Sequence, residues 1–440
     1  MKKIQSLIIA ILALFVANIA QAATGYQTSY VSLGRQSAVI YRPVKSSAKT
    51  SIAVVVMHSD DNYLDFPANA ELAKRGYTVI ATLPTPGGDM GPKLMNIKAC
   101  VDYLRKQPGI KKVLLLGHSG GATVMTAYEL LAENGLSALK GKLFTDYKQD
   151  LSHLPKADGM LLLDANYGNA IMSLVSLDPN IKGRGNGANV PEEFNLADPA
   201  VGYVAGKSSN YTKAFKARYN RGQRDRLYAL MADAQARYQA IKSGNGEFAD
   251  DEPFIIAGAN QIRPFNRLFA QDLSLLSHTK RAWPLVHGNG TVTTEVVHSL
   301  RAPLAPDAKS NTLFAANVTT VRSFLSTNAI KVGENFRVRE DSIEGVDWTS
   351  NINNPIGNST GIHVPVLMMG MTGSWEYLAA EMIYDHIASK DKSLGFVEGA
   401  SHMFAPDHDA EVFQGRKFGD TTKALFDYVD KWLSAKGRFM

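Results

Sequence analysis

Short runs of consecutive aliphatic residues, separated by helical patterns, constrain the fold of this chain most. Such a run is typical of a strand that is buried on both faces of a parallel sheet. Strand and helix patterns alternate through the first third of the sequence and again near its end, which predicts an α/β fold with a mostly parallel sheet and helices on both faces. The predicted strands are 52–57, 78–83, 113–116, 160–163, 364–369 and 394–397, with an antiparallel hairpin at 27–44, and the predicted helices are 67–76, 91–107, 122–133, 377–389 and 421–435.

The alternation is interrupted between residues 167 and 356. This segment is far longer than an ordinary connection and therefore needs packed elements of its own. Its clearest pattern is a long helix at 211–241, where aromatic and aliphatic residues recur at helical spacing. We predict a core formed by residues 23–166 and 357–440, interrupted by a large, mainly helical insertion at 167–356.

The first 22 residues have the pattern of a secretory signal peptide. Two lysines precede an apolar run at 7–17, and the A-x-A sequence Ala20-Gln21-Ala22 follows. The apolar run is shorter than the roughly 20 residues that span a bilayer, and an uncleaved anchor is the alternative. We predict an exported protein, periplasmic or extracellular, with no stable membrane span after cleavage.

The composition excludes a disordered chain and a multi-span membrane protein, because 45% of the residues are hydrophobic and 20% are charged. The formal net charge of the chain is +6, and most of the excess positive charge lies at 207–242. This segment contains nine lysines and arginines but only two aspartates. Nucleic-acid binding requires a broader basic face with stacking aromatic residues, so no nucleic-acid partner is predicted. A single cysteine, Cys100, cannot form an internal disulfide.

The strongest catalytic signal is Gly117-His118-Ser119-Gly120-Gly121, which lies between a predicted strand and a predicted helix. This is the context that a G-x-S-x-G nucleophile requires. Residues without a Cβ allow the sharp turn that projects a serine Oγ into a cleft. The N–H groups and the positive dipole end of the following helix would stabilise an oxyanion. We therefore predict that Ser119 is a nucleophile.

These features resemble the α/β-hydrolase superfamily over about Gln27 to Asn166 and Val364 to Met440, with the middle segment where that family carries its cap. The resemblance implies a catalytic histidine after the last strand, and His402 fits that position. As the general base it would take the Oγ proton and return it to the leaving group. His408, in the same loop, is the alternative.

The acidic residue of the expected triad is not an aspartate at the position where the family pattern places it. The resemblance places it just after strand 364–369, but that segment carries Glu376 and Glu381 and no aspartate. Asp164, at the end of strand 160–163, is the preferred candidate, because certain haloalkane dehalogenases resemble this arrangement. Those enzymes use an aspartate nucleophile, and Ser119 excludes their chemistry. Glu376 and Glu381 remain the alternatives.

The oxyanion hole is expected to combine the backbone N–H of Gly120 with that of Ser59 or Asp60, after strand 52–57. His58 and Asp60 have an alternative role, which is to hold that loop by hydrogen bonds. Trp375, beside the expected triad loop, is the candidate for the substrate pocket.

Other clusters are weaker candidates. We interpret Trp283, Trp348 and the tyrosines of the insertion as residues of its own core, and a role in lining a substrate pocket is the alternative. His402, Asp407, His408 and Asp409 resemble a metal cluster, but His402 is assigned to the triad. We therefore predict no metal and no cofactor, since water and a triad suffice.

The sequence predicts an exported serine hydrolase that cleaves a carboxylic ester of a small molecule through an acyl-enzyme intermediate. One alternative is an amidase or peptidase on the same scaffold. The other is a non-catalytic binding protein that has kept the hydrolase fold.

Overall fold

The computed structural model describes residues 25–87, 89–184, 193–259, 267–303 and 316–440. The predicted signal peptide at 1–22 lies outside the described residues. Within the described ranges, none of the helices is long and apolar enough to cross a membrane.

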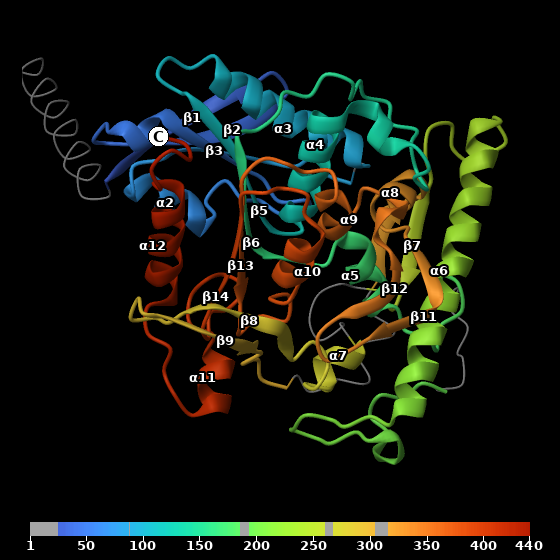
Figure 1. Cartoon of the computed structure of the whole chain (residues 1–440). Helices are drawn as coiled ribbons and strands as arrows, with labels where there is room; N and C mark the ends of the chain where they lie inside the picture. The colour runs from blue at the N-terminus through green and yellow to red at the C-terminus, as the bar shows by residue number, and fades with distance from the viewer. Residues whose placement is uncertain (1–24, 88, 185–192, 260–266, 304–315) are drawn as a thin grey trace, which may run out of the picture.

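A ten-stranded sheet forms the centre of the molecule, in the order β1-β2-β4-β3-β5-β6-β13-β14-β8-β9 (Figure 1). The strands from β4 to β8 in this order run parallel, whereas β1, β2 and β9 pair antiparallel at the two edges. The strands are β1 (Tyr26–Leu33), β2 (Gln36–Pro43), β3 (Ile52–Val56), β4 (Thr78–Thr82), β5 (Lys112–Ser119), β6 (Gly159–Ala165), β8 (His278–Val286), β9 (Val292–His298), β13 (Val366–Met371) and β14 (Lys392–Val397).

Helices cover both faces of this sheet. On β3, Ala53 and Val55 point to one hydrophobic cluster and Val54 and Val56 to the other, as the two-residue period of a strand requires. One face is covered by α2 (Pro67–Lys74) and α12 (Thr421–Leu433). The opposite face is covered by α3 (Met90–Arg105), α4 (Gly121–Asn134), α9 (Pro355–Ser359) and α10 (Ala379–His386). The predicted fold class is thus correct.

The inserted segment contains both helices and strands. Its longest element is α6 (Lys213–Lys242), whose start is capped by the Thr212 hydroxyl, which accepts a hydrogen bond from the Phe215 N–H. It also contains α5 (Asn169–Ser176), α7 (Arg267–Gln271), α8 (Val321–Thr327) and two small antiparallel sheets, which pair β7 (Pro253–Ala257) with β10 (Ala316–Thr320) and β11 (Lys331–Val338) with β12 (Ile343–Asp347).

The predicted boundary of the insertion is wrong for two strands. We assigned all of 167–356 to a cap outside the core, but β8 and β9 lie within that range and extend the main sheet beyond β14. β9 is largely exposed, and β8 is only partly buried. The edge strand β9 and its neighbour β8 therefore lack the continuous apolar run that marks a strand covered on both faces.

Candidate active site

Ser119 occupies the tight turn between β5 and α4. Its φ is +52°, in the left-handed region that residues with a Cβ rarely adopt. A Cβ at Gly117 would lie 2.5 Å from the Cα of Ala122, and one at Gly121 would lie 2.7 Å from the carbonyl oxygen of Met57. Glycine is therefore required on both sides of the turn. This steric requirement explains the two glycines of the G-x-S-x-G pattern.

His402 lies in the loop after β14, and its Nδ1 is 2.7 Å from Oδ2 of Asp164. Asp164 ends β6 with a φ of +45° and is fully buried. Its other oxygen, Oδ1, accepts a hydrogen bond of 2.9 Å from the Met371 N–H. Because a carboxylate at Nδ1 favours the proton on that nitrogen, Nε2 of His402 is left able to accept a proton.

A second carboxyl group faces the same imidazole. Oε2 of Glu376 is 3.5 Å from Nδ1 of His402, and the side chain is buried. Burial raises the pKa of Glu376 to about 7; the charge of Asp164 also raises it, while His402 and a hydrogen bond from Ser119 lower it. The carboxyl of Glu376 is therefore only partly ionised near neutral pH.

The third candidate acid, Glu381, lies elsewhere. It belongs to α10, and its carboxylate accepts hydrogen bonds from the indole Nε1 of Trp283 at 2.6 Å and from the backbone of Lys280 at 2.9 Å. These contacts fasten α10 to β8. Of the three predicted acids, the structure brings Asp164 and Glu376 to His402 and places Glu381 away from it.

The loop after β3 packs directly on the start of α4. A Cβ at Gly120 would lie 2.3 Å from Oγ of Ser59, so the two residues predicted to form the oxyanion hole are in close approach. Asp60 accepts a hydrogen bond of 2.6 Å from the Ser59 hydroxyl and forms an ion pair of 2.9 Å with Lys93. Asp60 thus fixes the position of this loop.

Sequence reasoning missed the role of His118, the variable residue of the motif. His118 is buried, its Nε2 lies 2.7 Å from the backbone oxygen of His402, and its Nδ1 lies 2.7 Å from the hydroxyl of Tyr63. Burial lowers the pKa of His118 well below its usual value, so the ring is neutral. It therefore donates to His402 from Nε2 and accepts from Tyr63 at Nδ1, which ties the turn at Ser119 to the loop of His402. A histidine within an aliphatic strand run was the available signal.

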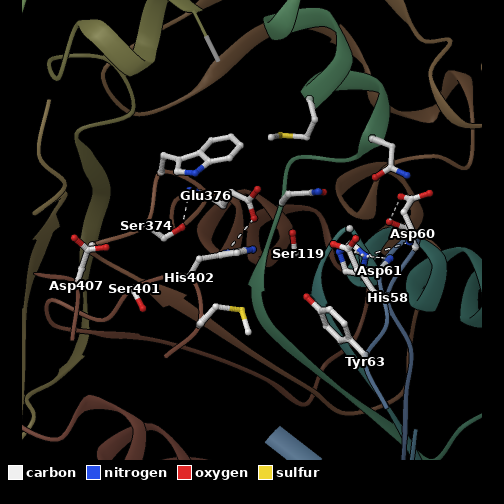
Figure 2. Close-up of a pocket in the computed structure, with 18 residues that line it drawn as sticks. His58, Asp60, Asp61, Tyr63, Ser119, Ser374, Glu376, Ser401, His402 and Asp407 are labelled. Carbon is white, nitrogen blue, oxygen red and sulfur yellow. Dashed lines mark hydrogen bonds and ion pairs between the residues drawn. The ribbon is translucent and has the colours of Figure 1, made fainter. Parts of the chain in front are cut away.

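These residues line one cavity of about 630 Å³. Figure 2 shows Ser119 with His402 on one side and His58 on the other. Trp375 lines this cavity, and its ring lies 5.7 Å from that of Phe269 in the inserted segment. The full lining is His58, Ser59, Asp60, Asp61, Tyr63, Ser119, Gly120, Asn166, Asn169, Met172, Gly373, Ser374, Trp375, Glu376, Ser401, His402, Met403 and Asp407.

The histidine and aspartates at 407–409 do not gather around His402. Asp407 caps α11 (His408–Gln414), and its Oδ1 accepts a hydrogen bond of 2.8 Å from the Ala410 N–H. Instead, Asp164, Glu376 and His402 place one potential ligand atom each within 4.8 Å of one another. A metal ion bound there would replace the hydrogen bond between His402 and Asp164.

The free energy of unfolding of Glu376→Gln is expected to depend less on pH than that of the wild type. The pKa of Glu376 is about 7 in the folded protein against 4.5 for an ordinary glutamate, so the folded state binds more protons between these values. The contribution of Glu376 to the free energy of unfolding is therefore complete below about pH 4.5 and is lost as the pH rises through 7. This contribution is at most about 3 kcal/mol. Urea denaturation at pH 5 and pH 8 measures the difference. An equal fall in wild type and variant would contradict this account.

No family model and no curated protein sequence matches the chain. Among solved structures, it is similar to carboxyl esterase 2 from the fungus Tuber melanosporum, with 10% identity, a TM-score of 0.41, and coverage of 94% of this chain and 88% of the other. It is also similar to Est1E from Butyrivibrio proteoclasticus (10% identity, TM-score 0.39, 91% and 97% coverage) and to a hormone-sensitive lipase from a metagenome library (11%, 0.41, 94% and 86%).

Similarities at these values carry no functional argument, but the topology of the chain itself identifies its fold. Its parallel strands follow the order β4-β3-β5-β6-β13-β14, with helices on both faces. A strained serine stands between β5 and α4, and a histidine follows β14. These are the features of the family that the sequence resembles. The chain therefore has the α/β-hydrolase fold.

Proposed function

We propose that the protein is an exported serine hydrolase that cleaves a carboxylic ester of a small molecule. One observation supports the proposal most strongly: Ser119 and His402 line the same cavity, and Nδ1 of His402 lies 2.7 Å from the buried carboxylate of Asp164. An imidazole held in this way has the orientation that a general base needs. The signal-peptide pattern at 1–22 supports export, and a mature N-terminus at Ala23 would be direct evidence for it.

In the proposed reaction, Oγ of Ser119 attacks the ester carbonyl while Nε2 of His402 takes the hydroxyl proton. Asp164 stabilises the imidazolium that forms, and the backbone N–H groups of Gly120 and Ser59 stabilise the oxyanion. His402 then gives its proton to the departing alkoxide, which leaves as the alcohol. A water molecule, deprotonated by His402, attacks the acyl-enzyme and releases the acid and the free serine.

Labelling with a fluorophosphonate tests the nucleophile. We expect one label per wild-type chain at Ser119, and turnover of p-nitrophenyl esters that varies with acyl chain length. A folded protein with an unreactive serine would favour the binding protein considered above. Cleavage of aminoacyl anilides without cleavage of esters would favour the amidase.

His118→Phe is expected to lower kcat about 10- to 100-fold with little change in KM, because the loop of His402 loses its hydrogen bond to β5. His118→Gln keeps an amide N–H able to reach the His402 carbonyl and should retain more of the wild-type kcat. Steady-state kinetics of the two variants provides the measurement. Equal kcat in both would show that the hydrogen bond does not position the imidazole.

A further inference from the structure

His58 lies in the loop that follows β3, and one of its two ring nitrogens already accepts two hydrogen bonds. Its Nδ1 accepts hydrogen bonds from the backbone N–H of Asp60, at 3.1 Å, and from that of Asp61, at 2.9 Å. A ring nitrogen that accepts hydrogen bonds carries no proton, so the ring proton of a neutral His58 is on Nε2.

The ring is neutral under ordinary conditions. Burial lowers the pKa of His58 to about 4, against the opposing effect of Asp61 and Asp60 and with the help of His402 and Lys93. His58 therefore has one donor, Nε2–H, and no capacity to act as a base at neutral pH.

This donor points into the cavity of Ser119. Nε2 lies 3.3 Å from the position that a Cβ of Gly120 would occupy, and His58 lines the same cavity. Among the described residues, its two hydrogen bonds are those at Nδ1, so Nε2–H has no protein acceptor there. The ring is stacked on Tyr63, with centroids 4.6 Å apart and an interplanar angle of 27°. The donor is thus held in place and left available to a ligand.

We propose that Nε2–H of His58 is a side-chain donor of the oxyanion hole, which hydrogen-bonds the substrate carbonyl oxygen as it becomes negatively charged. This inference rests on the proposed function. Figure 2 shows His58 and His402 on opposite sides of Ser119. The two imidazoles then have complementary roles, because Nε2 of His402 accepts the serine proton while Nε2 of His58 donates to the oxyanion. A neutral donor fixed before the reaction stabilises the transition state without reorganisation.

Two substitutions separate this role from that of holding the loop. His58→Asn retains an oxygen near the position of Nδ1, which can accept from the amides of Asp60 and Asp61, but it lacks the distal donor. His58→Gln places an N–H₂ near the position of Nε2 but loses the acceptor for the loop. We expect kcat of His58→Asn to fall by about 10²- to 10³-fold, as for other oxyanion-hole donors, and that of His58→Gln to fall less.

A trifluoromethyl ketone supplies a second readout, because it forms an oxyanion on the serine. Its inhibition constant should rise in His58→Asn by about the same factor by which kcat/KM falls, while KM for the ester changes little. Full activity in His58→Asn, or lower activity in His58→Gln than in His58→Asn, would overturn the assignment and leave His58 as a loop residue. The proposed function itself fails if the wild type neither takes up a fluorophosphonate nor cleaves an ester, and that result overturns both proposals.

Discussion

Ser119→Ala is expected to lower kcat for p-nitrophenyl esters by about six orders of magnitude, to the level left by substrate binding and the oxyanion hole alone. The substitution removes the atom that forms the acyl-enzyme. It leaves the turn intact, because alanine and serine are under the same strain at a φ of +52°. The thermal midpoint should therefore stay close to that of the wild type. Steady-state kinetics and a thermal melt of the same preparation check both parts.

Ser401→Ala is the matched control, because Ser401 lines the same cavity and precedes His402. Its kcat should stay within about tenfold of the wild-type value, since its backbone is not strained and its side chain has no part in the proposed reaction. A Ser119→Ala protein that retained more than about one per cent of the wild-type kcat would show that another group performs the reaction.

Features that depend on residues close together in the sequence could be predicted from it. Ser119 is recognisable because its turn depends on neighbours in the chain, namely a buried strand, two glycines and a helix. The parallel core was likewise predictable, because its strands are buried on both faces and therefore read as continuous apolar runs.

The choice of acid depends on distances between strands and could not be made from the sequence. β6 and β13 are neighbours in parallel register, so their carboxyl ends lie at the same edge of the sheet. A carboxylate that follows either strand can therefore reach the same imidazole, as both Asp164 and Glu376 do. Glu381 lies five residues farther along the chain, within α10, and its side chain contacts β8 instead.

The edge of the sheet and the role of His118 were also beyond local patterns. β8 pairs with β14 at only two positions, Phe396 with Leu285 and Val397 with Val286, and a short contact at an exposed edge imposes little apolar periodicity. The motif leaves the identity of residue 118 open. Its contact with His402 spans 284 positions of the chain and therefore required the three-dimensional structure.

Asp164→Asn is expected to lower kcat by about four orders of magnitude, whereas Glu376→Gln should lower it by about tenfold or less. The short hydrogen bond of Asp164 to His402 fixes the imidazole tautomer, and an asparagine amide at that position favours the wrong one. Glu376 is 3.5 Å from the same nitrogen and is only partly ionised near neutral pH, so it contributes less to holding the ring or to balancing its charge.

Kinetics of the two single variants and of the double variant distinguish three arrangements of the acids. If Asp164 is the orienting acid, the double variant should be about as inactive as Asp164→Asn, because little orientation is left for Glu376 to provide. If Glu376 fills the role, the order of the two single variants reverses. If either carboxylate suffices, both single variants stay active and only the double variant loses about four orders of magnitude. The buried hydrogen bond between Asp164 and the Met371 N–H favours the first outcome, because it holds the carboxylate in place before the imidazolium forms.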